Sequence, residues 1–329
     1  MSNYSNHPIR IGIVGYGNLG KGVETELAFH PDMTLVGIFS RRDPQTVDSE
    51  SAVFHMDDLE NMTDQIDVLI LCGGSATDIP EQAPILQKQF TTVNAYDNHA
   101  EIPAHFDVID ALAKTHQNVG VIATGWDPGL FSLNRLVAEA VLPKGGTYTF
   151  WGSGVSQGHS DAIRRVNGVK LGVQYTVPNE SLIEAIKEGE EVAYTKTSSH
   201  KRVCYVVAEA GADLTAISET IKTMKDYFDG YETEVHFIDE ADYYRDHQGM
   251  PHGGRVIRRG YTDDQTMAVY EFALDLGSNP QFTAAASIAY ARAAYRLDQE
   301  GQYGAKSVFD IAPAYLSPKS GAELRKELL

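Results

Sequence analysis

The feature that most constrains the fold of this 329-residue chain is a glycine pattern near its N-terminus. Gly15-Tyr16-Gly17-Asn18-Leu19-Gly20 directly follows an apolar strand pattern, residues 9–14, and opens a helical pattern. In that context the first glycine permits a tight turn, the second lets the backbone approach a pyrophosphate, and the third allows close contact between helix and strand. The free N–H groups and dipole of the helix N-terminus favour the phosphates. We therefore predict a dinucleotide site rather than a plain glycine-rich turn.

Short apolar strands and amphipathic helices alternate over the first 125 residues, which predicts a parallel sheet. The predicted strands are residues 9–14, 34–39, 68–72, 92–95 and 119–123, with helices at 18–29, 80–89 and 101–116. Beyond Gly125, longer segments rich in Thr, Tyr and Val predict an antiparallel or mixed sheet, and helices are expected at 130–142, 180–188 and 213–224. The predicted class is α/β: a Rossmann-type parallel-sheet domain at 1–125 and an α+β domain at 126–279. An Ala-rich helix at 282–300 is expected to bring residues 280–329 back onto the first domain.

The tip of the second predicted strand distinguishes NAD from NADP. A carboxylate there binds the ribose 2′-hydroxyl of NAD, whereas arginine accommodates the 2′-phosphate of NADP. The strand ends in Ser40-Arg41-Arg42, and two guanidiniums with a hydroxyl suit a dianionic phosphate. NADP is therefore the predicted cofactor, although Asp43 follows immediately and leaves NAD as an alternative.

Three further strand ends fall on the edge of the sheet where ligands bind in open α/β folds. Small residues there let the backbone approach the nicotinamide half of the cofactor, while ordinary turns are the alternative. The predicted cofactor-binding residues at these ends are Cys72, Gly73, Gly74, Ser75, Ala76, Thr77, Ala95, Tyr96, Asp97, Thr124, Gly125, Trp126, Asp127 and Pro128.

The composition excludes several other classes of function. A formal charge of −18 opposes binding to nucleic acid or to anionic membranes, because such binding depends on clustered Lys and Arg. No apolar stretch approaches the roughly 18 residues that span a bilayer, and no export signal is visible, so a cytoplasmic protein is expected. Cys72 and Cys204 lie far apart without metal-ligand spacing, and no metal site is predicted.

Several long, ordered segments of the chain resemble the meso-diaminopimelate dehydrogenase family. The resemblance runs through nearly the whole sequence. It is carried by Ile13-Val14-Gly15-Tyr16-Gly17-Asn18-Leu19-Gly20, Gly37-Ile38-Phe39-Ser40-Arg41-Arg42, residues 75–84, Tyr96-Asp97-Asn98-His99, Thr124-Gly125-Trp126-Asp127-Pro128-Gly129, residues 156–161, His200-Lys201-Arg202 and Gly249-Met250-Pro251-His252-Gly253-Gly254.

The resemblance implies a set of substrate-binding residues. Asp97, Asp127 and Trp151 would surround the reacting amino group, and these three are the implied catalytic residues. Thr176, Arg202, His252 and Asn279 would hold the distal end, since a substrate with an ammonium and a carboxylate at each end needs both acidic and basic partners. Trp126 would also contact the substrate, and the loop bordering it would contribute Gln157, Gly158 and Asp161.

The implied reaction is NADP-dependent, reversible oxidative deamination of the D-centre of meso-2,6-diaminopimelate to L-2-amino-6-oxopimelate and ammonia, in lysine and cell-wall precursor biosynthesis. Hydride loss requires a neutral amine, so Asp97, Asp127 or water must accept a proton. The family also implies a homodimer joined through the second domain.

Two alternatives to this function remain at the level of sequence, and a third is rejected. Another NADP-dependent oxidoreductase with the same two-domain plan is the first, because one fold hosts many chemistries. A non-catalytic NADP-binding regulator is the second. A Ser-His-Asp hydrolase can be drawn from Ser156, His159 and Asp161, but the chain lacks a nucleophile elbow.

Overall fold

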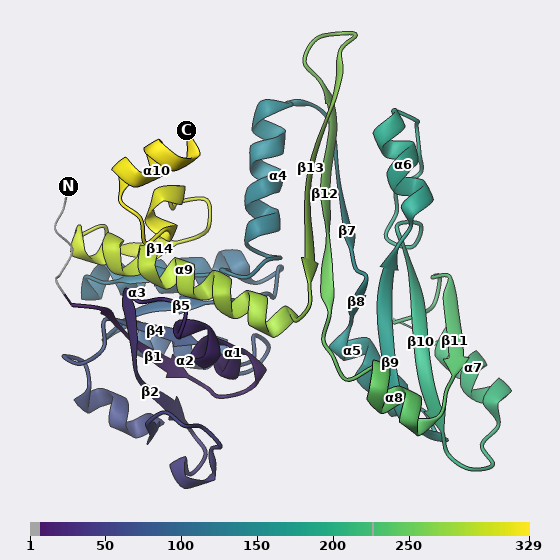
Figure 1. Ribbon diagram of the computed structural model, residues 1–329, viewed down its shortest axis with the longest axis horizontal. Coiled ribbons are helices and arrows are strands. Elements are labelled where there is room, and N and C mark those ends of the chain that lie inside the picture. The colour runs from purple at the N-terminus through teal and green to yellow at the C-terminus, as the bar shows by residue number, and fades with distance from the viewer. Residues whose placement is uncertain (1–6, 226) are drawn as a thin grey trace. The chain divides into compact units, whose positions relative to one another are not determined.

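The computed structural model describes residues 7–225 and 227–329, and they form two compact units (Figure 1). The first unit comprises Met1–Leu133 and Pro280–Leu329, and the second comprises Asn134–Asn279. The boundary falls inside helix α4 (Leu130–Val141) rather than at residue 125. The edge of the buried Phe131 ring packs against Trp126 with the ring centroids 5.2 Å apart, and this contact keeps the start of α4 with the first unit.

A seven-stranded parallel sheet forms the centre of the first unit, in the order β14-β6-β5-β4-β1-β2-β3. The strands are β1 (Ile9–Val14), β2 (Met33–Ser40), β3 (Val53–His55), β4 (Val68–Leu71), β5 (Thr91–Asn94), β6 (Val119–Val121) and β14 (Gly304–Lys306). The helices are α1 (Asn18–Leu27), α2 (Ile79–Leu86), α3 (Ile102–His116), α9 (Asn279–Gln299) and α10 (Gly321–Leu328). Short 3-10 helices lie at Pro44–Thr46, Met56–Asn61 and Pro313–Leu316.

Helices cover this sheet on both faces, so its central strands are buried and read as continuous apolar runs. One core cluster joins alternate strand residues to α1 and α9, through side chains such as Val23 and Ile288. The opposite cluster joins the other strand residues to α2 and α3, through Leu86 and Ile109. The layering is therefore helix, sheet, helix.

An ion pair between a buried arginine and a half-buried aspartate ties α9 to the N-terminal part of the same unit. Arg292 is 1% exposed and donates to both carboxylate oxygens of Asp32, at 2.6 and 2.9 Å. It also donates to the carbonyl of Leu316. Burial raises the pKa of Asp32, but the hydrogen bond and charge of Arg292 outweigh it and hold that pKa below its usual value.

The second unit contains two sheets. One is antiparallel, in the order β13-β12-β7, and the other is mixed, in the order β11-β10-β9-β8. The strands are β7 (Lys144–Trp151), β8 (Gly154–Val155), β9 (Val169–Pro178), β10 (His200–Ala208), β11 (Thr233–Phe237), β12 (His252–Tyr261) and β13 (Met267–Leu276). Its helices are α4, α5 (Gln157–Arg164), α6 (Glu180–Glu188), α7 (Leu214–Lys222) and α8 (Glu240–Asp246).

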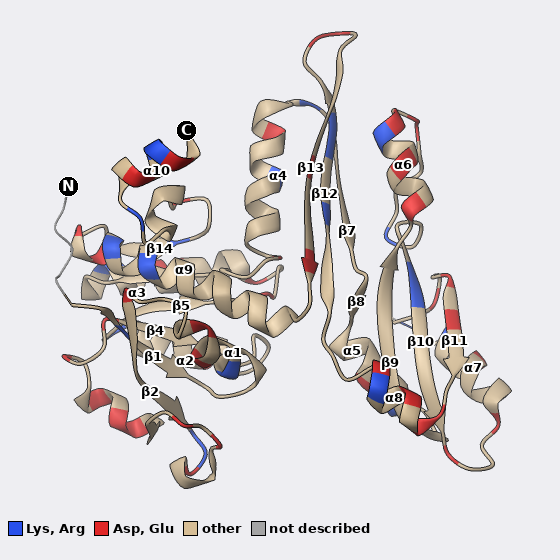
Figure 2. Cartoon of the chain, viewed as in Figure 1, with Lys and Arg blue, Asp and Glu red and all other residues tan. Residues whose placement is uncertain are grey.

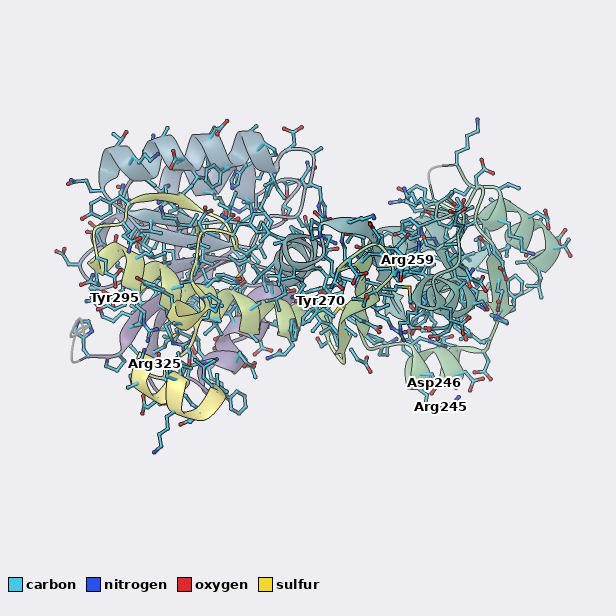
Figure 3. The ribbon with its side chains drawn as sticks, turned by 90° about the horizontal axis from the view of Figure 1, so that it is seen from above. Arg245, Asp246, Arg259, Tyr270, Tyr295 and Arg325 are labelled. Atoms are coloured by element: carbon cyan, nitrogen blue, oxygen red, sulfur yellow. The ribbon has the colours of Figure 1, made fainter. Side chains whose placement is uncertain are left out.

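Polar contacts fix several elements of the second unit to one another. Tyr270 of β13 donates from its hydroxyl to Asn134 of α4 at 2.7 Å, and Arg259 of β12 donates to the carbonyl of Glu190 (Figure 3). On α8 the guanidinium of Arg245 grips Asp246 through two hydrogen bonds. Apolar side chains of β7, β12 and α6, among them Phe150, Ile257 and Ile183, form a separate small core.

The predicted fold class, a Rossmann-type parallel sheet with a second α+β region, is confirmed. Several elements were not predicted, above all the central strand β12. Its residues, His-Gly-Gly-Arg-Val-Ile-Arg-Arg-Gly-Tyr, look like a polar loop because three glycines and three arginines interrupt the apolar pattern. Within the described residues, no helix is long and apolar enough to cross a membrane.

Candidate functional site

The glycine turn has the geometry that its three glycines predict. Gly15 has a φ of +89°, a left-handed conformation that favours glycine. A Cβ on Gly20 would lie 2.3 Å from the carbonyl oxygen of Gly15, so the close contact between α1 and the end of β1 requires glycine there. A Cβ on Gly17 would meet nothing within 4 Å, and the bare backbone therefore faces open space. Asn18 and Leu19 form the first turn of α1 with Gly20.

A cavity of about 390 Å³ adjoins this turn. Of the predicted cofactor residues it is lined by Gly15, Tyr16, Gly17, Ser40, Arg41, Arg42, Cys72, Gly73 and Gly74. These residues follow β1, β2 and β4, whose carboxyl ends meet at one edge of the sheet. Acidic side chains are spread over both units, whereas the loop after β2 brings two adjacent arginines to the cavity (Figure 2).

Both arginines of this loop are held by neighbouring groups. The side chain of Arg42 donates to the carbonyl of Tyr16 at 2.8 Å, and its backbone N–H donates to the hydroxyl of Ser40 at 3.1 Å. Arg41 forms an ion pair with Asp78 at 2.5 Å, and Asp78 also accepts from the backbone N–H of Gly74 at 2.9 Å. The arginine loop and the glycines after β4 are thus linked through one carboxylate.

The remaining predicted cofactor residues of the first unit follow β4, β5 and β6 outside that cavity lining. Ser75, Ala76 and Thr77 form the turn that leads to α2, and the hydroxyl of Ser75 accepts from the backbone N–H of Asp97 at 3.3 Å. Ala95, the buried Tyr96 and the exposed Asp97 come directly after β5. Thr124 is buried, and its hydroxyl lies 3.2 Å from the carbonyl of Asn94 and 3.1 Å from the hydroxyl of Ser287.

The turn that follows Thr124 carries Gly125, Trp126, Asp127 and Pro128. The indole of Trp126 is buried against Phe131, and Asp127 is half-buried. The peptide bond between Asp127 and Pro128 is cis. Asp97, Trp126 and Asp127 belong to the first unit, and the other predicted substrate residues belong to the second.

In the second unit Trp151 is positioned by His200. The backbone N–H of Trp151 donates to Nε2 of His200 at 2.7 Å, and the two rings stack with their centroids 5.5 Å apart. Because Nε2 accepts, the ring proton lies on Nδ1, which faces the hydroxyl of Ser199 at 2.9 Å. Burial and then the positive charge of Arg202 lower the pKa of His200 to about 4, so this imidazole is neutral at pH 7.

Thr176 and Arg202 are opposite each other on the antiparallel strands β9 and β10. Nη1 of Arg202 donates to the hydroxyl of Thr176 at 2.6 Å, and both side chains are only 7% exposed. Among the described residues no carboxylate pairs with Arg202, and its buried Nε has no hydrogen-bond partner there. A buried, uncompensated guanidinium of this kind suits an anionic ligand.

The other predicted substrate residues of the second unit lie at different places relative to these two strands. Gly154 pairs with Thr176, and a Cβ on Gly154 would lie 2.5 Å from the ring of His252, so both residues lie beside Gly154. The backbone of Asn279 donates to the carbonyl of Met250 at the start of α9. Gln157 and Gly158 are exposed in the first turn of α5, while the carboxylate of Asp161 pairs with Arg164 of the same helix.

The three residues of the hydrolase alternative do not form a catalytic triad. The hydroxyl of Ser156 lies 2.7 Å from Nδ1 of His159, but Nε2 of His159 faces the carbonyl of Tyr227 rather than a carboxylate. Burial, followed by the charge of Arg202, lowers the pKa of His159 to about 4. Asp161 is engaged by Arg164 instead.

Sequence reasoning missed several residues that the structure adds. Asp78 and Gln82 line the cavity, and the buried Oε1 of Gln82 has no partner among the described residues. His200 and Tyr231 contact predicted site residues. Asp78 and Gln82 lie on or beside α2, directly after the predicted glycine loop, and that position was the available signal. Within the described residues, no cluster of three or more His, Cys, Asp or Glu side chains could hold a metal ion.

Comparisons with known proteins agree with one another. A family model for the diaminopimelic acid dehydrogenase C-terminal domain matches residues 125–278. The chain is 56% identical to a meso-diaminopimelate D-dehydrogenase of Ureibacillus thermosphaericus, over 98% of this chain and 99% of that protein. It is 52% identical to the one of Corynebacterium glutamicum, over 95% and 96%.

Two solved structures extend these similarities to the fold. The C. glutamicum DAP dehydrogenase in complex with DAP is 51% identical with a TM-score of 0.88, covering 98% of this chain and 99% of that one. An engineered D-amino acid dehydrogenase bound to NADP+ is 49% identical with a TM-score of 0.82, covering 98% and 100%.

Proposed function

Because the chain belongs to the diaminopimelate dehydrogenase family, we propose that it catalyses the reversible, NADP-dependent oxidative deamination of the D-centre of meso-2,6-diaminopimelate. The products are L-2-amino-6-oxopimelate and ammonia, and the reaction belongs to lysine biosynthesis. The structural observation that carries the proposal is the buried Arg202, hydrogen-bonded to Thr176 and without a protein counter-charge among the described residues. A neutral substrate would leave that charge uncompensated.

The residues after β1 and β2 fit the cofactor. The bare backbone at Gly17 and the start of α1 suit a pyrophosphate, and the side chains of Ser40, Arg41 and Arg42 suit the 2′-phosphate of NADP. NADP, when bound, accepts the hydride that leaves the D-centre. The protein then has to fix the orientation of the substrate and to remove a proton from its ammonium group.

We assign the substrate contacts by charge. Asp97 and Asp127 would hold the reacting ammonium group, with Trp126 and Trp151 as apolar walls. Arg202, Thr176, His252 and Asn279 would hold the distal carboxylate and amine, and Gln157, Gly158 and Asp161 would border the substrate. The neutral state of His200 supports this arrangement, because this imidazole adds no second positive charge close to Arg202.

The direct test is turnover. Purified protein is mixed with NADP and meso-diaminopimelate at alkaline pH, and absorbance reports the reduced cofactor, with NAD, the L,L isomer and a simple D-amino acid in parallel. Reduction that requires both NADP and the meso isomer is expected. Tight NADP binding without any reduction would instead favour another oxidoreductase or a regulator.

The proton acceptor is tested with Asp127→Asn. We expect kcat to fall on the order of 100-fold, since a positioned general base contributes roughly 10²–10⁴-fold. Asp97→Asn, measured alongside, distinguishes the two carboxylates. An unchanged rate and pH profile in Asp127→Asn would remove Asp127 from this role.

We also propose that the enzyme is a cytoplasmic homodimer that joins through its second unit, with no nucleic-acid or membrane partner. Exposed apolar side chains on α4 and β13 support this: Leu136, Val137 and Val141 with Met267 and Val269. Sedimentation at micromolar concentration tests the dimer, and a charged substitution such as Val141→Asp is expected to weaken it.

A further inference from the structure

We infer that Tyr231 is the positioning residue that sets the plane of the Arg202 guanidinium, and thereby the grip of the enzyme on the distal carboxylate of its substrate. This inference rests on the proposed function. Tyr231 lies between α7 and β11, outside every segment that carries the family resemblance.

The inference rests on a cation–π interaction between Arg202 and Tyr231. The guanidinium carbon of Arg202 lies 4.1 Å from the centre of the Tyr231 ring. At this distance the guanidinium lies over the ring, and the ring quadrupole attracts the cation most strongly when water is excluded, as it is at a 7% exposed arginine. Thr176 holds one end of the same guanidinium through Nη1. One contact therefore fixes the plane and the other fixes rotation within it.

Backbone hydrogen bonds fix the chain at Tyr231 and at the residue that follows it. The N–H of Tyr231 donates to the carbonyl of Phe228 at 3.0 Å, and the N–H of Arg202 donates to the carbonyl of Glu232 at 2.8 Å. Strand β11 begins at once afterwards and pairs Thr233 with Arg202. The tyrosine and the arginine are thus fixed to each other through the sheet as well as through their side chains.

What remains of Arg202 for a ligand is the edge that carries Nε, which is buried and has no hydrogen-bond partner among the described residues. That edge matches the two oxygens of a carboxylate, provided that the guanidinium keeps its plane. Burial lowers the pKa of this arginine, whereas a side-chain hydrogen bond from Arg202 to the hydroxyl of Tyr231 raises that pKa and adds to the hold on the same guanidinium. The imidazoles of His159 and His200 lie near the same charge, and both stay neutral at pH 7. Neither competes for the carboxylate as a second cation.

The experiment compares Tyr231→Phe, which keeps the ring, with Tyr231→Leu, which removes it. Tyr244→Leu, at an exposed tyrosine of α8, is the matched control. For Tyr231→Leu we expect the KM for meso-diaminopimelate to rise on the order of tenfold, from the typical strength of a desolvated cation–π pair. The kcat and the KM for NADP should change less than threefold, and Tyr231→Phe and Tyr244→Leu should resemble the wild type.

A double-mutant cycle tests whether the effect passes through Arg202. Arg202→Lys keeps a cation but loses the plane, so adding Tyr231→Leu to it should raise the KM by less than twofold. An undiminished effect in the Arg202→Lys background would overturn the inference, and so would a wild-type KM in Tyr231→Leu. Equal losses in Tyr231→Phe and Tyr231→Leu would assign the effect to the hydroxyl and also overturn it.

Failure of the proposed function gives a different result. In that case the wild-type protein itself would not reduce NADP with meso-diaminopimelate. An unfolded Tyr231→Leu protein would lose NADP binding together with turnover. The KM for NADP and the thermal unfolding of the Tyr231→Leu protein identify that case, and the Arg202→Lys cycle is then run with Tyr231→Met.

Discussion

His200 connects a predicted site residue to the acid stability of the second unit. It accepts the backbone N–H of Trp151 through Nε2, stacks on its ring, and is only 5% exposed. Protonation would remove the acceptor and place a second cation near Arg202. The folded chain therefore keeps this imidazole neutral, with a pKa of about 4 against an ordinary value of 6.5.

The sign of the resulting pH dependence follows from that shift. Between pH 6.5 and about 4 the unfolded chain binds the proton and the folded chain does not, so stability is present above pH 6.5 and is lost as the pH falls. His200→Gln keeps an acceptor and cannot titrate. We expect its unfolding free energy to fall less than that of the wild type between pH 7 and pH 5, by about 2 kcal/mol.

Tryptophan fluorescence measures this effect in the second structural unit, which contains both His200 and Trp151. The chain has two tryptophans, so a Trp126→Phe background leaves Trp151 as the only one. Urea unfolding is followed in that background at both pH values. Identical slopes with and without His200 would contradict the assignment. His159, which is half-buried and also neutral at pH 7, contributes its own slope and serves as the comparison.

The arginines after β2 carry a prediction about cofactor preference. Arg42→Ala removes a guanidinium that the carbonyl of Tyr16 and the hydroxyl of Ser40 hold in the cavity lining. We expect the KM for NADP to rise at least tenfold and the KM for NAD to change little, since charge-assisted hydrogen bonds contribute roughly 1.5–3 kcal/mol. Arg245→Ala, at a surface ion pair of α8, is the control. Equal effects on both cofactors would argue against a 2′-phosphate contact.

The sequence alone predicted many candidate site residues but not the residues that hold them in position. Gly15, Gly17 and Arg42 could be predicted because each lies at a fixed offset from a strand end, where fold geometry determines what a ligand meets. Tyr231 and His200 could not, because their partners come from other strands, and a lone tyrosine or histidine has no pattern of its own. Arg202 was found only through the family resemblance.

At the scale of elements, the turn between β1 and α1 separates two roles of glycine. Gly20 is required by the packing of the helix on the turn, since its Cβ would meet the oxygen of Gly15. Gly17 is not required by the protein, because its Cβ would enter open space and its φ of −95° suits any residue.

This difference predicts opposite phenotypes for two alanine substitutions. Gly20→Ala should destabilise the first unit by about 1–3 kcal/mol through the backbone clash. Gly17→Ala should leave thermal unfolding unchanged and still weaken NADP binding at least tenfold, because the methyl group occupies the approach of the pyrophosphate. Calorimetry without cofactor and NADP titration measure the two effects. Normal NADP affinity in Gly17→Ala would place the pyrophosphate elsewhere.

Element prediction succeeded where the hydrophobic period was regular. Helix α6 was predicted at 180–188 and lies at Glu180–Glu188, with Asn179 capping it and Gly189 ending it. Strand β12 was missed because glycine and arginine replace apolar residues in it. Its Arg258 is buried and donates hydrogen bonds to the carbonyls of Leu142 and Pro143. No local sequence pattern predicts these distant partners.

At the scale of the whole molecule, the first unit is assembled from both ends of the chain. The buried Arg292 of α9 and the half-buried Asp32 before β2 form an ion pair that links the two parts. Removing one partner of such a pair leaves an uncompensated charge.

Arg292→Met should therefore lower the unfolding free energy of the first unit by about 1.5–3 kcal/mol, the typical contribution of a hydrogen bond to a charged group, because water can partly solvate the half-buried Asp32. Arg325→Met, at an exposed arginine of α10, should change it by less than about 0.5 kcal/mol. Because Arg292 keeps the pKa of Asp32 low, the link is present above pH 4 and is lost as the pH falls through the folded pKa. Thermal unfolding at pH 7 compares the variants, and equal melting temperatures would contradict the prediction.

The position of β14 has a consequence for the order in which the protein forms on the ribosome. Strand β14 (Gly304–Lys306) is an edge strand and pairs with β6. Helix α9 covers one face of the same sheet. Domains generally fold as units while the chain is synthesised from its N-terminus. Residues 134–279 emerge before the rest of α9 is made, so the second unit can fold during translation while the first still lacks the apolar residues of α9, such as Ile288. The first unit is thus started first and completed last, once residues 280–329 have joined it.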